Sequence, residues 1–526
     1  MSAWTTLESA VASIPDGALL GLGGFQLNRA PMALVMEIAR QGKRRLRVVS
    51  VPNALPLDLL TGAGLVAEAE FGFLGFQYEG GFVVAPNVRR AVERGTIAWK
   101  ERDVYEIVQG LRAAAHGLPF LPAPGAEGSG YARVNRTPTV KDPGTGEEIL
   151  VATAIRPEVT LLHAQEADRE GNLAIADPYA DDLLARASGR VIATAERIVE
   201  RIERPTIPAG RVATLTEAPL GAFPTSCHGH YGWSKAHLAT YLALASEGRT
   251  GDYVDRYLRA GRPAFLAAVA READGPEAGR ETSGPERPAA VDRLVVGMAR
   301  AIDDGDVVTT GVASALPMLA VALAKATHAP RAIYINCVGA VDPPLAAAAW
   351  SSVDPRLLDG CRDRVALPEL FDIARQGRID LMYFGAAQAD VEGCLNLTCI
   401  GDYARPKVKL PGPAGSSAMR PFVRKVVVLL PRHSTKTLVP RVDFATSVPS
   451  RRNEATIVVT DLAILRLQGG RLRLVSRHPG IATETLGAAT GFRLEGDLET
   501  TTAEPTDAER EALRRLDPGG IRHRLA

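Results

Sequence analysis

The sequence predicts two related, doubly wound α/β domains joined by a linker. Short apolar segments with strand character alternate with segments whose apolar residues recur at helical spacing. Two sequence signatures also occur in the same order in both halves of the 526-residue chain, which indicates duplication of one unit. Between the halves, one segment is rich in Gly, Pro and charge and has no apolar period. We therefore expect domains at 1–271 and 291–526 and a linker at 272–290.

The alternation of strands and helices is visible in both halves. Continuous apolar runs are typical of parallel strands that are buried on both faces, and apolar residues three and four positions apart indicate helices that cover them. The expected strands are LRVVSV (46–51), GRVIATAE (189–196), AIYINCV (332–338) and KVVVLL (425–430). The expected helices are APMALVMEIARQGK (30–43), VYEIVQGLRAAAHG (104–117) and LPMLAVALAKATH (316–328).

The repeated signatures support duplication. IPDGALLGLGGF at 14–25 parallels IDDGDVVTTGVAS at 302–314, because an Asp-Gly turn leads into a β-rich run in both. HAQEADREGNL at 163–173 parallels GAAQADVEGCL at 385–395, because each ends an apolar strand and turns at Glu-Gly. Each half therefore contains one copy of the same α/β unit.

Composition excludes several classes of protein. Hydrophobic residues make up 46% and charged residues 23% of the chain, and the formal net charge is +1. This balance is typical of a soluble globular protein and predicts no nucleic-acid partner and no membrane partner. The N-terminal residues do not resemble a signal peptide, and no apolar run reaches the roughly 20 residues needed to cross a bilayer. Five scattered cysteines fit a reducing compartment, so we expect a cytoplasmic protein.

We expect no metal site. The cysteines form no C-x-x-C pair, and no histidine lies near Cys394 or Cys399. The segment 227–230, with one cysteine and two histidines, has ligand types at short spacing. We favour a loop with polar side chains over a metal cluster for this segment.

Two glycine-rich loops are candidate binding elements. The loop 21–25 follows a predicted strand, and Gly23 and Gly24 would expose backbone N–H groups toward an oxyanion. In the loop 410–422, Gly412, Gly415 and Ser416 would bind a phosphate or a pantetheine amide. The alternatives are a tight strand-to-helix turn for the first loop and a plain surface turn for the second. Neither loop matches the nicotinamide-binding or P-loop pattern.

Ordered motifs extend over most of the chain. The first half contains GLGGF, RAVERGTIAWKE, LRAAAHGLPFLPAPG and HAQEADREGNLAI, and the second contains INCVGAVDPP, GAAQADVEGCLNL, LPGPAGSSAM, VPRVDFATS, VSRHPGI and TGFRL. With these motifs the chain resembles the family I CoA-transferase superfamily, in particular the glutaconate CoA-transferase type with both subunits fused. The resemblance implies a fused pseudo-heterodimer of the CoA-transferase fold, an acyl-CoA substrate, and a dimer of fused chains. Coenzyme A would arrive with the substrate, and no permanently bound cofactor is implied.

The position of the transferase nucleophile departs from the family pattern. In this family a glutamate at the tip of a second-half strand, two residues before a glycine, attacks the thioester and then carries CoA. Aligned on Gly339, that position is Cys337, with Asn336 beside it. A thiolate can accept an acyl group, but it cannot form the mixed anhydride. Three interpretations stay open: an inert buried thiol, an acyl-accepting nucleophile, or a carboxylate supplied from elsewhere.

Glu101 is the best alternative carboxylate. It precedes a helix expected to begin near Asp103, and the other interpretation is a solvated acid favoured by the helix dipole. The resemblance extends to the two-subunit steroid ring-opening hydrolases, which also lack the transferase glutamate and are thought to use a first-subunit glutamate as base. Glu101 is the matching position, and an apolar pocket would raise its pKa. Glu79 is a second candidate acid.

The sequence therefore predicts an acyl-CoA-processing enzyme, with a hydrolase favoured over a transferase. Glu101 would activate water for C–C ring opening or thioester hydrolysis. The developing negative charge would fall on the Gly23 and Gly24 amides, and on Asn336 or Gly339. The alternatives are a CoA-transferase, with Cys337 as an unusual acyl acceptor, and a catalytically inactive CoA-ester binding protein.

Overall fold

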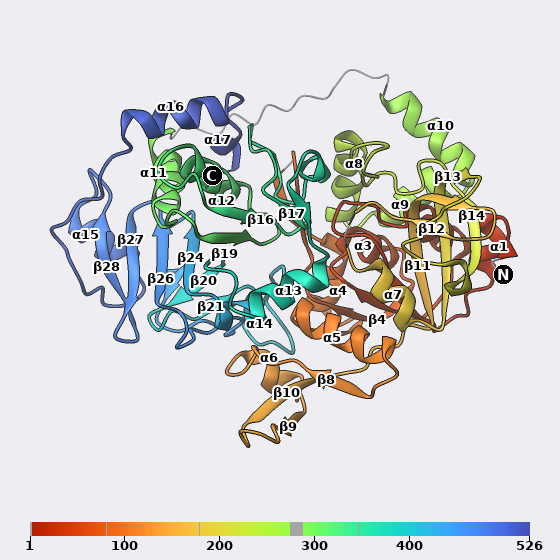
Figure 1. The fold of residues 1–526 in the computed structure, drawn as a ribbon, viewed down its shortest axis with the longest axis horizontal. Helices are drawn as coiled ribbons and strands as arrows, with labels where there is room; N and C mark the ends of the chain where they lie inside the picture. Colours follow the sequence, from red (N-terminus) through yellow and green to blue (C-terminus); the bar gives the residue numbers. More distant parts are fainter. Residues whose placement is uncertain (1–2, 80, 178, 274–287, 347, 526) are drawn as a thin grey trace. The chain divides into compact units, whose positions relative to one another are not determined.

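The computed structural model of the chain describes residues 3–79, 81–177, 179–273, 288–346 and 348–525 (Figure 1). The chain forms two compact units, and each unit includes a short segment from the other half of the sequence. Unit 1 consists of Met1–Pro124, Asn135–Arg280 and Arg405–Pro411. Unit 2 consists of Gly125–Val134, Glu281–Ala404 and Gly412–Ala526.

Unit 1 is built on a sheet whose main strands are all parallel, as their continuous apolar sequences predict. The strand β12 (Leu173–Ala174) is an antiparallel addition to β11. The main strands, in order across the sheet, are β1 (Ala3–Trp4), β14 (Val212–Glu217), β13 (Arg190–Val199), β11 (Val159–Asp168), β2 (Leu19–Leu22), β3 (Leu46–Ser50), β4 (Val66–Phe71) and β7 (Ala98–Glu101).

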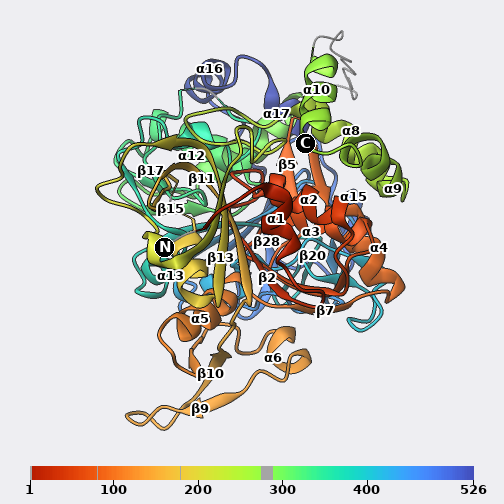
Figure 2. The same ribbon diagram turned by 90° about the vertical axis from the view of Figure 1, so that its right-hand side faces the viewer.

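The helices of unit 1 bury apolar faces against this sheet, and Figure 2 shows α1, α2 and α3 close together. Leu34, Val35 and Ile38 of α2 are fully buried in the core, as helical spacing predicts. The helices are α1 (Leu7–Ala12), α2 (Met32–Gln41), α3 (Ala54–Gly62), α4 (Pro86–Arg94), α5 (Val104–Ala115), α7 (Asp181–Ala187), α8 (Lys235–Ser246), α9 (Thr250–Tyr253) and α10 (Arg262–Ala273). Small sheets are formed by β5 (Gly75–Tyr78) with β6 (Gly81–Val84), and by β8 (Phe120–Pro122), β10 (Glu148–Thr153) and β9 (Thr139–Lys141).

Unit 2 is built on a mixed sheet with a parallel centre. The five central strands run parallel, and the two outer strands on each side are antiparallel to their neighbours. The strand order is β18 (Asp363–Arg364), β17 (Ala340–Val341), β16 (Ile333–Ile335), β15 (Val307–Thr310), β19 (Leu381–Gly385), β24 (Lys425–Leu430), β26 (Ala455–Thr460), β27 (Ala463–Gln468) and β28 (Arg471–Arg477).

The helices of unit 2 include α12, which is buried along most of its length. A small sheet is formed by β21 (Leu395–Asn396), β20 (Gln388–Asp390) and β25 (Leu438–Val439). The helices are α6 (Gly130–Val134), α11 (Pro288–Ala299), α12 (Ala315–Ala326), α13 (Leu367–Arg375), α14 (Ser416–Met419), α15 (Thr483–Ala489), α16 (Asp507–Leu516) and α17 (Ile521–Leu525).

The predicted repeat has the same geometry in both units. In unit 1, the Oδ1 atom of Asp168 accepts hydrogen bonds from the N–H groups of Glu170 and Gly171, both at 3.0 Å. In unit 2, the Oδ1 atom of Asp390 accepts one from Glu392 at 3.1 Å. Both aspartates end a sheet strand and stabilise the following Glu-Gly turn. The two α/β units with a repeated signature agree with the predicted fold class.

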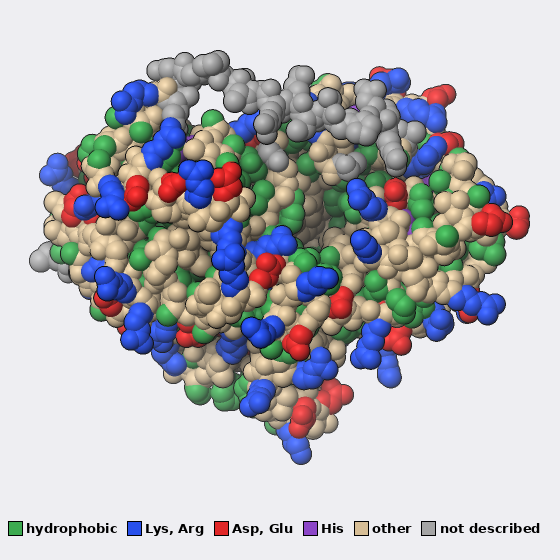
Figure 3. All heavy atoms as spheres, turned by 180° about the vertical axis from the view of Figure 1, so that it is seen from behind, with side chains coloured by type: hydrophobic (Ala, Val, Ile, Leu, Met, Phe, Trp, Pro, Cys, Tyr) green, Lys and Arg blue, Asp and Glu red, His purple; other side chains and the backbone are tan. Residues whose placement is uncertain are grey.

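The predicted domain boundaries are close to those of the units, apart from the two exchanged segments. Residues 274–287 of the predicted linker lie outside the described residues. Among the helices that the structure describes, none has the length and apolar character needed to span a membrane. On the face drawn in Figure 3, basic and acidic side chains are interspersed, as expected for a net charge of +1.

Candidate functional site

Glu101 is the last residue of β7, at the carboxyl end of the unit 1 sheet. Ligands of open parallel sheets bind at this end of the strands. Helix α5 begins just after it, and the side chain of Asp103 accepts a hydrogen bond from the Tyr105 N–H group at 2.9 Å. The predicted helix start is thus confirmed, and Glu101 itself belongs to the strand.

The environment of Glu101 differs from the apolar pocket expected from the sequence. Its carboxyl oxygen Oε1 lies 2.6 Å from the Lys409 Nζ atom, and both side chains are 0% exposed. A buried carboxylate needs a paired cation to offset its lost hydration. The pairing with Lys409 therefore favours the ionised form that a general base requires. Sequence reasoning placed Lys409 near a phosphate and gave no signal for this pair.

Cys337 lies just beyond a strand of the unit 2 sheet. The strand β16 ends at Ile335, two residues earlier than expected, and the chain turns at Gly339 (φ +88°) into β17. The Cys337 Sγ atom donates to the Gly311 carbonyl at 3.4 Å and lies 3.6 Å from the Ser352 carbonyl. Burial raises the pKa of the Cys337 thiol to about 12. The thiol is therefore protonated at neutral pH, so it is a poor nucleophile.

Asn336 is the candidate oxyanion donor with spare hydrogen-bonding capacity. Its Oδ1 atom accepts from the Ala340 N–H group at 2.9 Å, and its buried Nδ2 atom has no partner among the described residues. The Gly339 N–H group donates to the Asn336 carbonyl at 3.0 Å, so it is already engaged. The structure brings Asn336, Cys337 and Gly339 together in one turn, and of these Asn336 has an unused donor.

The Gly23 and Gly24 amides are engaged within unit 1. The Gly23 N–H group donates to the Leu161 carbonyl at 3.0 Å, and the Gly24 N–H group donates to the Asp181 Oδ1 atom at 3.0 Å. A Cβ atom on Gly23 would meet Asp181 Oδ1 at 2.5 Å. Instead of exposed amides, the loop has packed glycines whose donors are used internally, which corresponds to the tight strand-to-helix turn.

An ion-pair network explains why this loop is packed so tightly. Arg29 is fully buried, with its Nε atom 2.6 Å from Asp177 Oδ1 and its Nη2 atom 2.7 Å from Asp181 Oδ2. Burial lowers the pKa of Arg29, but the charges of Asp177 and Asp181 outweigh burial and raise it overall. Sequence reasoning missed this network because its members lie about 150 residues apart.

The second glycine-rich loop is also largely occupied by internal contacts. The Gly412 N–H group donates to the Leu397 carbonyl at 2.8 Å, and a Cβ atom on Gly415 would meet the Phe371 ring at 2.7 Å. The Ser416 Oγ atom is buried without a partner among the described residues. A CoA-binding role of these residues stays a prediction, and Ser416 Oγ is the group with unused capacity for it.

The remaining sequence candidates have structural roles in the described part of the chain. Glu79 accepts a hydrogen bond from the Trp233 indole at 2.8 Å. Cys227 lies beside His163 and Glu196 in the one group of metal-ligand types among the described residues. The His163 nitrogens already contact Glu196 at 2.7 Å and Thr194 at 2.8 Å, so a metal ion would have to displace these bonds.

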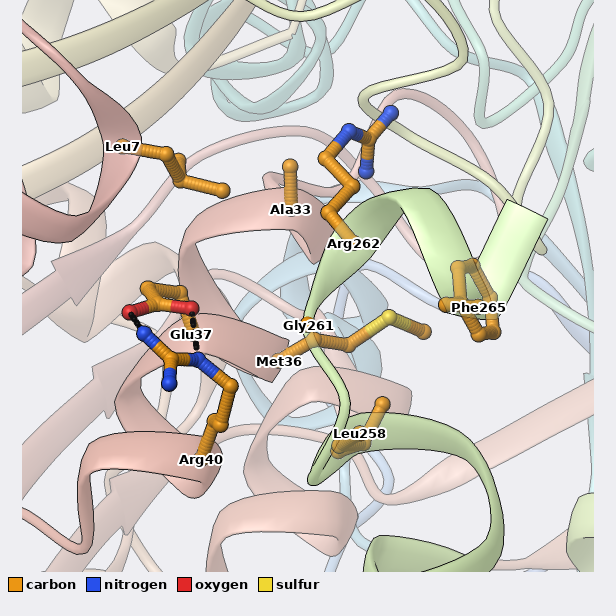
Figure 4. Close-up of a pocket in the computed structure, with 9 residues that line it drawn as sticks. All are labelled: Leu7, Ala33, Met36, Glu37, Arg40, Leu258, Gly261, Arg262 and Phe265. Atoms are coloured by element: carbon orange, nitrogen blue, oxygen red, sulfur yellow. Dashed lines mark hydrogen bonds and ion pairs between the residues drawn. The ribbon is translucent and has the colours of Figure 1, made fainter. Parts of the chain in front are cut away.

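One cavity in unit 1 is too small for a substrate. Its volume is about 20 Å³, which is enough for about one water molecule. Figure 4 shows Glu37 and Arg40 facing each other beside it, with their charged ends 2.6 Å apart. The lining residues are Leu7, Ala33, Met36, Glu37, Arg40, Leu258, Gly261, Arg262 and Phe265.

The family model for coenzyme A transferase matches residues 4–208 and 291–488. The chain belongs to the coenzyme A transferase family. The match covers both halves, so the predicted family and the fusion of two subunit-like halves are confirmed, and the protein is an acyl-CoA-processing enzyme of this superfamily.

Curated relatives match one half of the chain each. One subunit of the 3-oxoadipate CoA-transferase of Pseudomonas knackmussii is 31% identical over 52% of this chain and 100% of its own length, and a second subunit of that enzyme is 32% identical over 43% and 91%. A cholesterol ring-cleaving hydrolase IpdA subunit of Rhodococcus jostii is 31% identical over 51% and 96%. The chain also spans 58% of the length of an uncharacterized Archaeoglobus fulgidus protein at 32% identity, over 48% of this chain.

A solved structure supports the fold over nearly the whole chain. An acyl-CoA transferase, YdiF of Escherichia coli O157:H7, matches 96% of this chain and 95% of its own with a TM-score of 0.73 at 16% identity. At this identity the likeness concerns the fold. The predicted fused pseudo-heterodimer of the CoA-transferase fold is thereby confirmed.

Proposed function

We propose that the protein cleaves a carbon–carbon bond in a CoA thioester by hydrolysis, with Glu101 as general base. Coenzyme A enters as part of the substrate and no permanently bound cofactor is required. The proposal is supported by the family membership and by the name of the Rhodococcus jostii relative, a ring-cleaving hydrolase. We also propose a dimer of the fused chain and a cytoplasmic location.

The observation that carries the proposal is the neutral group after β16. A transferase of this family needs a carboxylate at the position of Cys337 to form an anhydride and then carry CoA. Cys337 is a buried thiol whose pKa burial raises to about 12. Its hydrogen-bond partners among the described residues are the carbonyls of Gly311 and Ser352 and the Ser352 hydroxyl. The anhydride step therefore has no acid at this point, which favours water over a carboxylic acid as acceptor.

In the proposed reaction, Glu101 removes a proton from water as the oxygen adds to a ketone carbon of the substrate. The bond between that carbon and the carbon next to the thioester then breaks. Its electron pair forms an enolate with the thioester carbonyl, and the proton held by Glu101 is returned to carbon. The ketone becomes a carboxylic acid, and the thioester stays intact. The spare Nδ2 donor of Asn336 is our candidate for the negatively charged oxygen.

A second candidate function is decarboxylation of an acyl-CoA that has a second carboxylate. Loss of CO2 leaves an electron pair conjugated with the thioester carbonyl, and this carbanion needs a proton. The Cys337 thiol, protonated at neutral pH, has one to give. The resulting thiolate would regain a proton from water. This candidate assigns Cys337 the role of proton donor and needs no base.

Product analysis tests the proposal. The protein is incubated with cyclic β-keto acyl-CoAs, with acyl-CoAs that have a distal carboxylate, and with acetate or succinate as possible acceptors. Ring-opening hydrolysis yields a CoA ester that gains the mass of water without free thiol. Decarboxylation yields a CoA ester that loses the mass of CO2. Exchange of CoA onto the acceptor acid, or recovery of every substrate unchanged, would overturn the proposal.

A further inference from the structure

The segment Arg405–Pro411 comes from the second half of the sequence but belongs to unit 1. It contains the short strand β23 (Val408–Lys409). The Lys409 N–H group donates to the Glu93 Oε1 atom at 2.8 Å, and the Leu74 N–H group donates to the Pro411 carbonyl at 2.6 Å. The segment is therefore held by its backbone at two points, on either side of the Lys409 side chain.

The Lys409 side chain is fully enclosed in unit 1. Its Nζ atom lies 2.6 Å from Glu101 Oε1 and 2.7 Å from the Leu410 carbonyl. The rings of Phe71 and Trp99 lie 5.7 and 5.8 Å from the ammonium group. Carboxylate, carbonyl and two aromatic faces together replace the water that a buried ammonium loses.

Other charged groups around the pair are engaged with one another. Arg102 pairs with Glu106 at 2.7 Å and with Glu70. Glu93 pairs with Arg89 at 2.9 Å on α4. The titratable and charged groups near the pair, from β4, α4, β7 and the start of α5, are Glu70, Arg89, Glu93, Lys100, Arg102, Asp103 and Glu106.

We propose that Lys409 is a positioning residue for Glu101, supplied to unit 1 by the segment Arg405–Pro411. Lys409 keeps the carboxylate charged and fixes the direction of its Oε1 atom. The activity of a base in the first half of the chain thus depends on a residue of the second half. The catalytic part of this inference rests on the proposed function, because it takes Glu101 as the base.

The variant Lys409→Met tests the pair without an activity assay. Methionine keeps the length and apolar part of the side chain but removes the charge. Glu101 would then be buried without its lysine, so its pKa in the folded protein would rise above the value in the unfolded chain. A raised carboxyl pKa gives stability that is present at low pH and lost as the pH rises through the folded value.

The measurement is the melting temperature at several values of pH. Between pH 5 and pH 8, Lys409→Met should lose about 5 °C relative to wild type. The double variant Glu101→Gln/Lys409→Met should lack this extra dependence on pH, because its buried pair is neutral. Lys325→Met is the matched control, since Lys325 pairs with Asp342 at 2.9 Å in a partly exposed site, and it should show a smaller change. Equal pH dependence for wild type and Lys409→Met would overturn the inference.

The pH–rate profile tests the positioning role. Lys409→Met should shift the acid limb of kcat/KM to higher pH and recover part of its activity there, because the base is again charged. A uniform loss of rate at every pH would indicate a structural role alone and contradict positioning. The proposed function fails separately, if Glu101→Gln is fully active, and the melting temperatures still decide whether the pair controls the charge of Glu101.

Discussion

The carboxyl ends of the two sheets differ in how charge is distributed. In unit 1, charged groups are buried and paired, with Arg29 between two aspartates and Glu101 beside Lys409. In unit 2, the turn after β16 contains neutral groups, namely the Asn336 amide and the Cys337 thiol. Duplication preserved the fold, while the ionisable chemistry resides in unit 1. A carboxylate for catalysis is therefore to be sought in the first half of the chain.

The largest expected effect concerns Glu101. Glu101→Gln keeps the shape of the side chain but removes the base, so turnover should fall by about two to four orders of magnitude. Initial rates of product formation from a responsive acyl-CoA measure the effect. The comparison between the units would be broken if this variant kept wild-type activity while Cys337→Ala lost it.

Removal of the buried cation in unit 1 should have the next largest effect. Arg29→Met leaves Asp177 and Asp181 buried without their guanidinium, and the free energy of unfolding should fall by about 3–5 kcal/mol. Denaturant unfolding monitored by circular dichroism gives the value. Arg259→Met removes an exposed pair with Asp255 and should cost less than about 1 kcal/mol. Similar losses for the two variants would contradict the central role of the unit 1 network.

The packing of the first glycine loop gives a smaller effect. Gly24 has φ +76°, and a Cβ atom there would meet the Arg29 carbonyl at 2.4 Å. Gly42 has φ +69° with nothing within 4 Å of such an atom. Both Gly→Ala variants share the cost of positive φ, so Gly24→Ala should be less stable than Gly42→Ala by about 1–3 kcal/mol. Equal stabilities would show that the loop is not closely packed.

The smallest effect is expected at Cys337. Cys337→Ala removes one small buried group, so the free energy of unfolding should fall by about 1 kcal/mol and most of the hydrolytic turnover should remain. Loss of turnover, with no gain of CoA exchange, would favour decarboxylation with the thiol as proton donor. With a pKa of about 12, about one thiol in ten thousand is ionised at pH 8. Iodoacetamide should therefore label Cys337 very slowly, as followed by peptide mass spectrometry.

The sequence predicted those features that depend on local pattern. The alternation of apolar strands and helices, the Asp103 start of α5 and the repeated Glu-Gly turns all follow from residues within a few positions of one another. The position of Cys337 after a buried strand was predicted to within two residues.

The features that were not predicted depend on distant residues. Lys409 is 308 positions from Glu101, and Asp181 is 157 positions from Gly24. No local pattern shows that the Gly23 and Gly24 amides are used by such partners, or that Glu101 has a cation beside it. Spacing could identify the candidate acid and the candidate loop, but their hydrogen bonds are set by tertiary packing.

The placement of Arg405–Pro411 in unit 1 has a consequence for biosynthesis. A ribosome adds about 5–20 residues per second, so Lys409 follows Glu101 out of the ribosome by about 15–60 s, given 308 intervening positions. During that interval the nascent first half holds an acid at the end of β7 without its lysine. Unit 1 matures only when translation is far into the second half.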